Sequence, residues 1–121
     1  MKLPVLMLAP VMALGLLAAD QAVLEADKKM KEGKYDEAIS TLMAAEKAKP
    51  KSPEIKKALV DTHLAYADSF MSGQLPPRQK YPNALREYRK VLEYDKANAK
   101  AQKNINDIET IYKSMGRPIP Q

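Results

Sequence analysis

Few residues in this chain are of a type that could carry out acid–base chemistry. The single histidine, His63, lies two residues after Asp61, and a histidine beside a carboxylate can act as a general base or as a pH-dependent switch. Residues two apart on a helix point to different sides, and the sequence places no serine nucleophile beside this pair. We therefore expect His63 to be a packed or half-buried histidine rather than a catalytic one.

The composition excludes most other kinds of catalytic and metal site. The 121 residues include no cysteine, which excludes disulfides, iron–sulfur clusters, cysteine-bound zinc and a thiol nucleophile. A single histidine excludes a multi-histidine metal site. The four glycines, Gly15, Gly33, Gly73 and Gly116, are too far apart to form a phosphate-binding loop. We therefore predict a protein without enzymatic activity, without a metal site and without a cofactor.

The first residues of the chain have the composition of an export signal. A basic start, Met1–Lys2, is followed by residues 3–19, which carry no charge. Pro4 and Pro10 disfavour a membrane-spanning helix, for which this stretch is at the short limit. We predict that residues 1–19 are a cleaved signal peptide and that the protein is periplasmic or secreted. The alternative is an uncleaved membrane anchor, with the rest of the chain facing outside the cytoplasm.

Residues 20–116 have the pattern of a single all-α domain. The segments between glycine, proline and asparagine are rich in alanine, leucine, lysine and glutamate, which favour helices. No segment alternates apolar and polar residues as a strand does. Apolar residues recur at helical spacing in five segments. We expect helices over residues 20–32, 36–49 and 53–72, a fourth from Pro82 and a fifth after Asn98 with an apolar stripe that includes Met115.

Individual residues mark the ends of these helices. Ser52 can cap the third helix, and Pro53 suits its first position. Gly33 predicts a tight turn, and Gly73 predicts a left-handed helix stop. Beyond the last helix we expect residues 117–121 to form a short extended tail that frays.

The chain repeats at an offset of 46 residues. The segment Tyr35–Ile39 matches the segment Tyr81–Leu85, and each begins a helix that is followed by a capped break and another helix. Later positions that match without a gap are Leu42 with Tyr88, Ala45 with Val91, Ser52 with Asn98, Ile55 with Ala101 and Leu59 with Ile105. A helix pair cannot bury its apolar face alone, so the two copies predict stacked pairs.

On these residues the chain resembles the tetratricopeptide repeat family, whose unit is two helices in about 34 residues. The segment Gly33–Ala38 is similar to the turn and second-helix start of that repeat, and the offset of 46 equals 34 plus a 12-residue insertion. The resemblance implies antiparallel helix-turn-helix pairs stacked as a short right-handed solenoid of five helices, the fifth acting as a cap. The positions it assigns to repeat packing are Tyr35, Ala38, Leu42, Ala45, Tyr81, Ala84, Tyr88 and Val91.

The resemblance also implies where a partner would bind. Modules of this family bind a protein or peptide in a concave groove lined by the first helix of each pair. In that register Asp27, Asp61 and Asp107 share one repeat-relative position, and Lys57 and Lys103 share another. Three such carboxylates would favour a basic peptide or backbone N–H donors. The alternative is that they are ordinary surface carboxylates paired with lysines one turn away.

A basic stretch and a long loop are two further candidate contact regions. Residues 78–103 contain eight basic and three acidic side chains, a net charge of +5, whereas residues 20–77 have a net charge of −1. This basic half is either a solvated face, a docking face for an acidic protein, or a contact to anionic lipid; no nucleic-acid partner is expected. We expect a loop over residues 73–81, stiffened by Pro76–Pro77. It is either a spacer or a partner contact through Leu75, Arg78 and Lys80.

Together these patterns predict an exported tetratricopeptide-like adaptor or scaffold that binds a protein or peptide in its concave groove. The alternative is a membrane-anchored, self-associating structural component of an envelope complex. So few repeats are compatible with a homo-oligomer, and a membrane contact is otherwise expected only through an uncleaved N-terminal segment.

Overall fold

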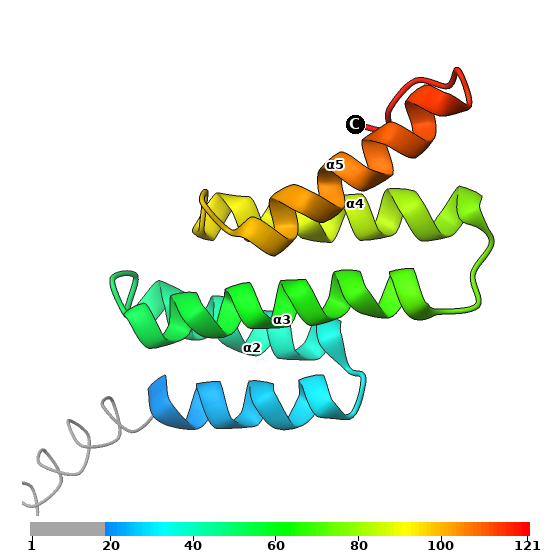
Figure 1. Cartoon of the computed structure of the whole chain (residues 1–121). Coiled ribbons are helices and arrows are strands. Elements are labelled where there is room, and N and C mark those ends of the chain that lie inside the picture. Colours follow the sequence, from blue (N-terminus) through cyan, green and yellow to red (C-terminus); the bar gives the residue numbers. More distant parts are fainter. Residues whose placement is uncertain (1–18) are drawn as a thin grey trace, which may run out of the picture. The chain divides into compact units, whose positions relative to one another are not determined.

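The computed structural model describes residues 19–121, and this part of the chain is helical with no strand (Figure 1). Residues 19–31 form the first of its five helices. The others are α2 (Tyr35–Ala48), α3 (Pro53–Ser72), α4 (Pro77–Tyr94) and α5 (Ala99–Ser114). The predicted all-α class is therefore confirmed. The signal peptide predicted for residues 1–19 lies, except for its last residue, outside the described residues.

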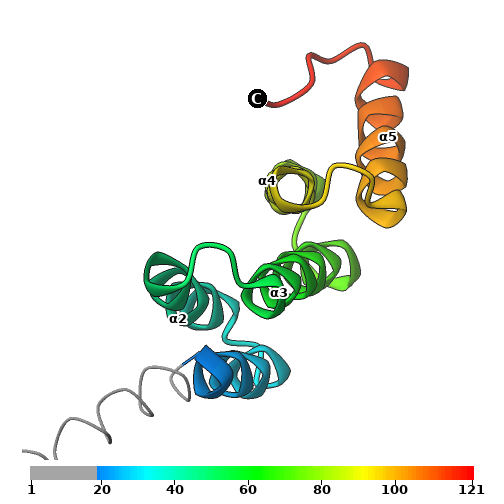
Figure 2. The same cartoon turned by 90° about the vertical axis from the view of Figure 1, so that its left-hand side faces the viewer.

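The chain divides into two compact units, with the boundary inside α3 between Ala58 and Leu59. The described part of the first unit contains helix 19–31, α2 and the beginning of α3. The second unit contains the remainder of α3, α4, α5 and the tail, with α3 and α5 on two sides of α4 (Figure 2).

In the first unit, every helical segment buries small or aliphatic side chains. Ala26 of helix 19–31, Ala38 and Leu42 of α2, and Ile55 of α3 are all buried. Lys29 adds a surface connection, because its ammonium group lies 3.7 Å from the carboxylate of Glu25 and 3.3 Å from that of Glu37 in α2. Exposed pairs of this kind contribute at most about 1 kcal/mol, so apolar burial provides most of the stability.

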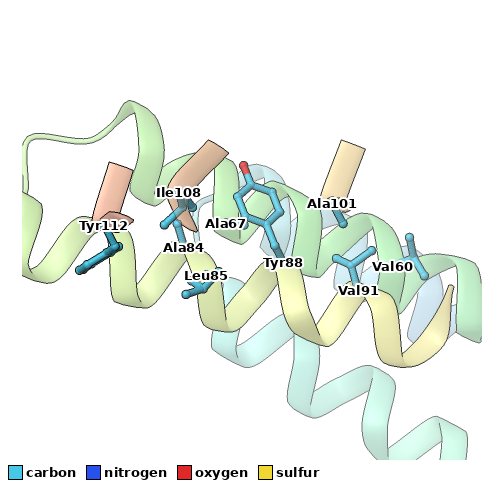
Figure 3. Close-up of a cluster of buried hydrophobic side chains, with 9 residues drawn as sticks. All are labelled: Val60, Ala67, Ala84, Leu85, Tyr88, Val91, Ala101, Ile108 and Tyr112. Atoms are coloured by element: carbon cyan, nitrogen blue, oxygen red, sulfur yellow. The ribbon is translucent and has the colours of Figure 1, made fainter. Parts of the chain in front are cut away.

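The second unit has one apolar core, and α4 contributes most to it (Figure 3). Leu85, Tyr88 and Val91 of α4 are among the largest fully buried side chains of the described residues. Burying a side chain of this size stabilises a fold by roughly 1.5–3 kcal/mol. The remaining members of the core are Val60 and Ala67 of α3, Ala84 of α4, and Ala101, Ile108 and Tyr112 of α5. The three alanines leave room for the helices to approach closely.

The turn after α2 and the turn after α4 make the same backbone hydrogen bonds, at an offset of 46 residues. After α2, the N–H of Lys49 donates to Ala45 O, and that of Ser52 donates to Lys49 O. After α4, the N–H of Asp95 donates to Val91 O, and that of Asn98 donates to Asp95 O. The backbone angles agree too, with φ −136° and ψ 74° at Lys49 and φ −143° and ψ 89° at Asp95.

The residue that follows each turn caps the next helix. Ser52 Oγ accepts a hydrogen bond from the N–H of Ile55 at 3.3 Å, and Asn98 Oδ1 accepts one from the N–H of Ala101 at 2.9 Å. In each case a side chain satisfies an N–H group that the first helical turn leaves without a partner. The predicted cap at Ser52 is thus confirmed, and Asn98 has the matching role in the second copy.

The fourth helix begins earlier than the sequence predicts, at Pro77 rather than near Pro82. Pro77 occupies the first helical position, where a missing N–H costs nothing, and Pro76 O accepts the N–H groups of both Gln79 and Lys80. Pro82 lies inside the helix and removes one backbone hydrogen bond. The predicted loop over residues 73–81 is therefore wrong in its second half, and only residues 73–76 are non-helical.

The role predicted for Gly73 is also wrong. Positive φ angles occur at Gly33 (79°) and Gly116 (65°), whereas Gly73 has none. Glycine is required at position 73 for a steric reason instead, since a Cβ atom there would clash with the backbone oxygen of Ser69 at a distance of 2.9 Å. At Gly33 the predicted turn is confirmed: the N–H of Lys34 donates to Lys29 O and that of Gly33 donates to Met30 O, which is a Schellman motif.

The tail does not fray as predicted but packs on the second unit. Ile119 lies against the apolar core. The guanidinium group of Arg89 donates to Pro120 O at 2.9 Å and to Gln121 O at 3.2 Å. Gly116 reverses the chain after α5 through a second Schellman motif, with Arg117 N–H donating to Tyr112 O. Met115, which the sequence places on the apolar stripe of this helix, is instead exposed.

We predict that the two caps contribute equally to stability. Ser52→Ala and Asn98→Ala should each lower the free energy of unfolding by about 1 kcal/mol, because each leaves an N–H group in the first turn without its partner. The variants Ser52→Asp and Asn98→Asp should retain most of the stability. Denaturant unfolding followed by helical circular dichroism measures these changes, with Ser40→Ala in the middle of α2 as the control. Equal stability of the cap variants and the control would contradict the prediction.

Candidate functional site

The buried polar pair of the second unit consists of His63 on α3 and Glu87 on α4. His63 Nδ1 lies 2.8 Å from Glu87 Oε1, and both side chains are only 6% exposed. The second oxygen of Glu87 accepts a hydrogen bond from Arg86 Nε at 2.9 Å. His63 also stacks on the ring of Tyr94, with the ring centroids 6.1 Å apart. The expectation of a packed histidine is therefore confirmed, and the carboxylate that it contacts is Glu87.

The surroundings of Glu87 lower its pKa below the ordinary value of 4.5. Burial acts in the opposite direction, but the hydrogen bonds from His63 and Arg86 and their charges outweigh it. Glu87 is thus held as a carboxylate that joins α4 to α3. A buried, fully paired contact of this kind holds the two helices in a fixed alignment.

A second polar contact joins the same helices through Asp68 of α3. Tyr88 donates its hydroxyl proton to Asp68 Oδ1 at 2.6 Å, and Lys100 of α5 donates to Asp68 Oδ2. Burial and the hydrogen bond to Asp68 raise the pKa of Tyr88 well above its ordinary value of 10. Tyr88 therefore remains a neutral donor, and Asp68 connects all three helices of the second unit.

The five residues predicted to face a groove are distributed over both units. Asp27 and Lys57 belong to the first unit, whereas Asp61, Lys103 and Asp107 belong to the second. Asp27 pairs with Lys31 at 2.9 Å, and Asp107 pairs with Lys103 at 2.7 Å, each one helical turn away. Asp61 and Lys57 are exposed and engaged in interactions of their own. The groove assignment thus stays a prediction for all five.

The candidate loop contacts occupy two kinds of structure. Leu75 lies in the loop over residues 73–76 and is exposed. Arg78 and Lys80, contrary to prediction, belong to the first turn of α4, where Arg78 is exposed and Lys80 is half-buried. Of the predicted packing residues, Tyr35, Ala45 and Tyr81 are half-buried. The others, which are Ala38, Leu42, Ala84, Tyr88 and Val91, are buried.

Sequence reasoning missed the partners Glu87 and Asp68. A usable signal existed for Glu87, because it lies three residues after Ala84 and four before Val91, on the apolar face of α4. A carboxylate on an apolar face requires a partner, and His63 was the available candidate on a neighbouring helix. For Asp68 the spacing carries no such signal, since its contacts depend on how α4 and α5 pack.

Within residues 19–121, no three histidine, aspartate or glutamate side chains are grouped so that they could hold a metal ion. Within the same range, no helix is long and apolar enough to cross a bilayer.

No family model, no curated protein and no solved structure matches this chain.

We predict that Glu87 makes stability pH-dependent in acid. Because its folded-state pKa lies below 4.5, the carboxylate stabilises the fold above about pH 4.5, and this contribution disappears as the pH falls through the folded-state pKa. Glu87→Gln should cost about 1–3 kcal/mol near neutral pH, and the difference from wild type should shrink in acid. Denaturant unfolding from about pH 3 to pH 7 measures both profiles.

The exposed variant Glu93→Gln, on the same helix, is the matched control for this experiment. It should follow the wild-type profile at every pH. A wild-type and a Glu87→Gln profile that stay parallel into acid would show that Glu87 is not the titrating group.

Proposed function

We propose that this protein is an exported, tetratricopeptide-like adaptor that holds a protein or peptide against its helices. The observation that carries the proposal is the turn between helices, which recurs with the same hydrogen bonds and the same capping position at an offset of 46 residues. Buried residues recur at the same offset, as in Ala38 with Ala84 and Leu42 with Tyr88. A duplicated helix pair supports a repeat architecture, and such architectures provide extended binding surfaces.

The proposed contacts to the partner are Asp27, Asp61 and Asp107. A carboxylate at this position can accept a hydrogen bond from a donor of a bound chain, such as a lysine, an arginine or a backbone N–H. Asp27 and Asp107 are paired with lysines on the surface, with 45% and 52% of their side chains exposed. Surface pairs of this kind are worth about 0–1 kcal/mol, so a partner can replace the lysine at little cost. The proposed partner is therefore a basic, extended segment.

We predict that peptides selected from a random displayed library by the full chain are enriched in lysine and arginine. Replacing Asp27, Asp61 and Asp107 together by asparagine should weaken the binding of a selected peptide at least tenfold, because each charge-assisted hydrogen bond contributes about 1.5–3 kcal/mol. Fluorescence anisotropy of the labelled peptide measures the affinity, and circular dichroism verifies that the variant folds.

The matched control replaces Glu25, Glu32 and Glu93 by glutamine, since these are also surface carboxylates paired with lysines. It removes the same charge and should bind the peptide like the wild type. An equal loss of peptide affinity in both triple variants would mean that net charge alone attracts the peptide. Unchanged affinity in the aspartate variant would contradict the assignment of Asp27, Asp61 and Asp107 as partner contacts.

The proposed export rests on the composition of the first residues, and the mass of the native protein tests it. Cleavage should remove about 15–19 residues from the N-terminus and leave a shortened species outside the cytoplasm. Intact-mass spectrometry of fractionated cells measures this. A full-length species found only in membranes would instead support the membrane-anchored, self-associating alternative.

A further inference from the structure

Two stretches of the chain that contain no acidic residue meet at one end of the second unit. Residues 69–86 and residues 110–121 contain no aspartate or glutamate. The first stretch includes the beginning of α4 and the second includes the end of α5. The beginning of α4 and the end of α5 lie on the same side of the second unit (Figure 1). They are neighbours, because the rings of Tyr81 and Tyr112 make an edge-on contact with their centroids 6.4 Å apart.

The cations at this end differ from most other cations of the second unit; Lys96 is the one further cation of its described residues that has no ion pair. Arg86, Arg89, Lys90, Lys100 and Lys103 each lie within 4.0 Å of a carboxylate. In contrast, Arg78 and Lys80 at the start of α4, and Lys113 and Arg117 at the end of α5, have no ion pair within the described residues. Four positively charged side chains without an ion pair thus belong to these two stretches, which contain no acidic side chain.

Two large apolar side chains are exposed in the same two stretches. Leu75, directly before α4, is 38% exposed, and Met115, directly after α5, is 48% exposed. Leu75 precedes two prolines, which restrict the backbone that presents it. Exposed aliphatic side chains beside unpaired cations are the composition of surfaces that lie at the boundary between lipid headgroups and acyl chains.

We propose that this end of the second unit, formed by Leu75, Arg78, Lys80, Lys113, Met115 and Arg117 and called the basic end below, docks on an anionic lipid surface. The cations are attracted by the headgroups, and each basic residue near an anionic membrane strengthens binding by about fivefold. The side chains of Leu75 and Met115 insert between the lipid headgroups, at the boundary with the acyl chains. The contact is peripheral, and it is independent of the adaptor role proposed above.

The distribution of the cations favours a lipid surface over an acidic peptide. Sites that recognise a single carboxylate or phosphate hold their arginines in a fixed orientation, so that two parallel hydrogen bonds form. Here two arginines and two lysines come from separate segments, and no described ion pair orients them. Long, unrestrained basic side chains adapt to a layer of headgroups while their apolar stems cover aliphatic surface.

Vesicle binding of the full chain tests the proposal. The wild type should bind phosphatidylcholine vesicles with about 30% phosphatidylserine at least tenfold more strongly than pure phosphatidylcholine, and less strongly as salt increases. Replacing Arg78, Lys80, Lys113 and Arg117 by glutamine should remove most of this difference. The control replaces Lys47, Lys51, Lys56 and Lys96, which are exposed and likewise lack a described ion pair, and it should behave as the wild type. The wild type and all these variants have the same N-terminal residues, so a membrane contact through that segment cannot cause a difference between them.

A fluorescent probe locates the contact, because the chain contains no tryptophan. Leu75→Trp and Met115→Trp should each show a blue-shifted emission when phosphatidylserine vesicles are added, since the indole leaves water. Met43→Trp is the matched control, because Met43 of α2 is also 48% exposed but belongs to the first unit. The emission wavelength of the Met43→Trp variant should stay the same when vesicles are added.

Three results would overturn the proposal. Equal losses of vesicle binding in the two glutamine variants would show that net charge, and not the basic end, is responsible. A shift at Met43→Trp without one at Leu75→Trp would place the contact elsewhere. Binding of polyglutamate that depends on the four cations, together with no binding to phosphatidylserine vesicles, would identify an acidic protein segment as the partner instead.

Discussion

The structure of the second unit depends on the burial of α4 against helices on two of its sides. Ala84, Leu85, Tyr88 and Val91 supply the apolar contacts, and none of them is more than 1% exposed. Because α4 is packed in this way, its polar residues cannot all reach water. Glu87 and Tyr88 meet this constraint by pairing with His63 and Asp68 of α3. The same helix thus supplies both the core and the polar contacts that determine how α3 and α4 align.

These polar contacts have a consequence for the surface charge. Asp68, Glu87, Glu93, Asp107 and Glu109 pair with five cations of α4 and α5, and none of these carboxylates pairs with a cation of the basic end. Pairing inside a unit weakens long-range attraction, because two opposite charges in contact leave only a dipole, whose field falls off faster with distance than that of a single charge. The exposed side chains of Leu75 and Met115 belong to the same two stretches as the four unpaired cations of the basic end. The packing of α4 and α5 thus buries apolar and paired polar side chains in the middle of these helices and leaves the unpaired cations of the proposed lipid contact at the basic end.

Local signals predicted the helices well, and their failures have local causes. The bounds of helix 19–31, α2 and α3 lie within one residue of the prediction because glycine and capping residues mark them directly. The start of α4 was misplaced because Pro77 and Pro82 both suit a first helical position, and only the backbone shows that Pro76 O accepts the first hydrogen bonds. Gly73 illustrates the same limit, because a close approach of Ser69 O requires glycine there and no left-handed angle does.

The sequence by itself determined the helical class, the caps at Ser52 and Asn98, and the repeat at an offset of 46 residues. These features depend on neighbours in the chain, whose geometry is set by the helical period and by backbone hydrogen bonds. Tertiary structure alone decided that His63 pairs with Glu87, that Asp68 joins three helices, and that the tail returns to Arg89. Those partners are separated by 20 or more residues, so their contacts depend on how the helices pack in space.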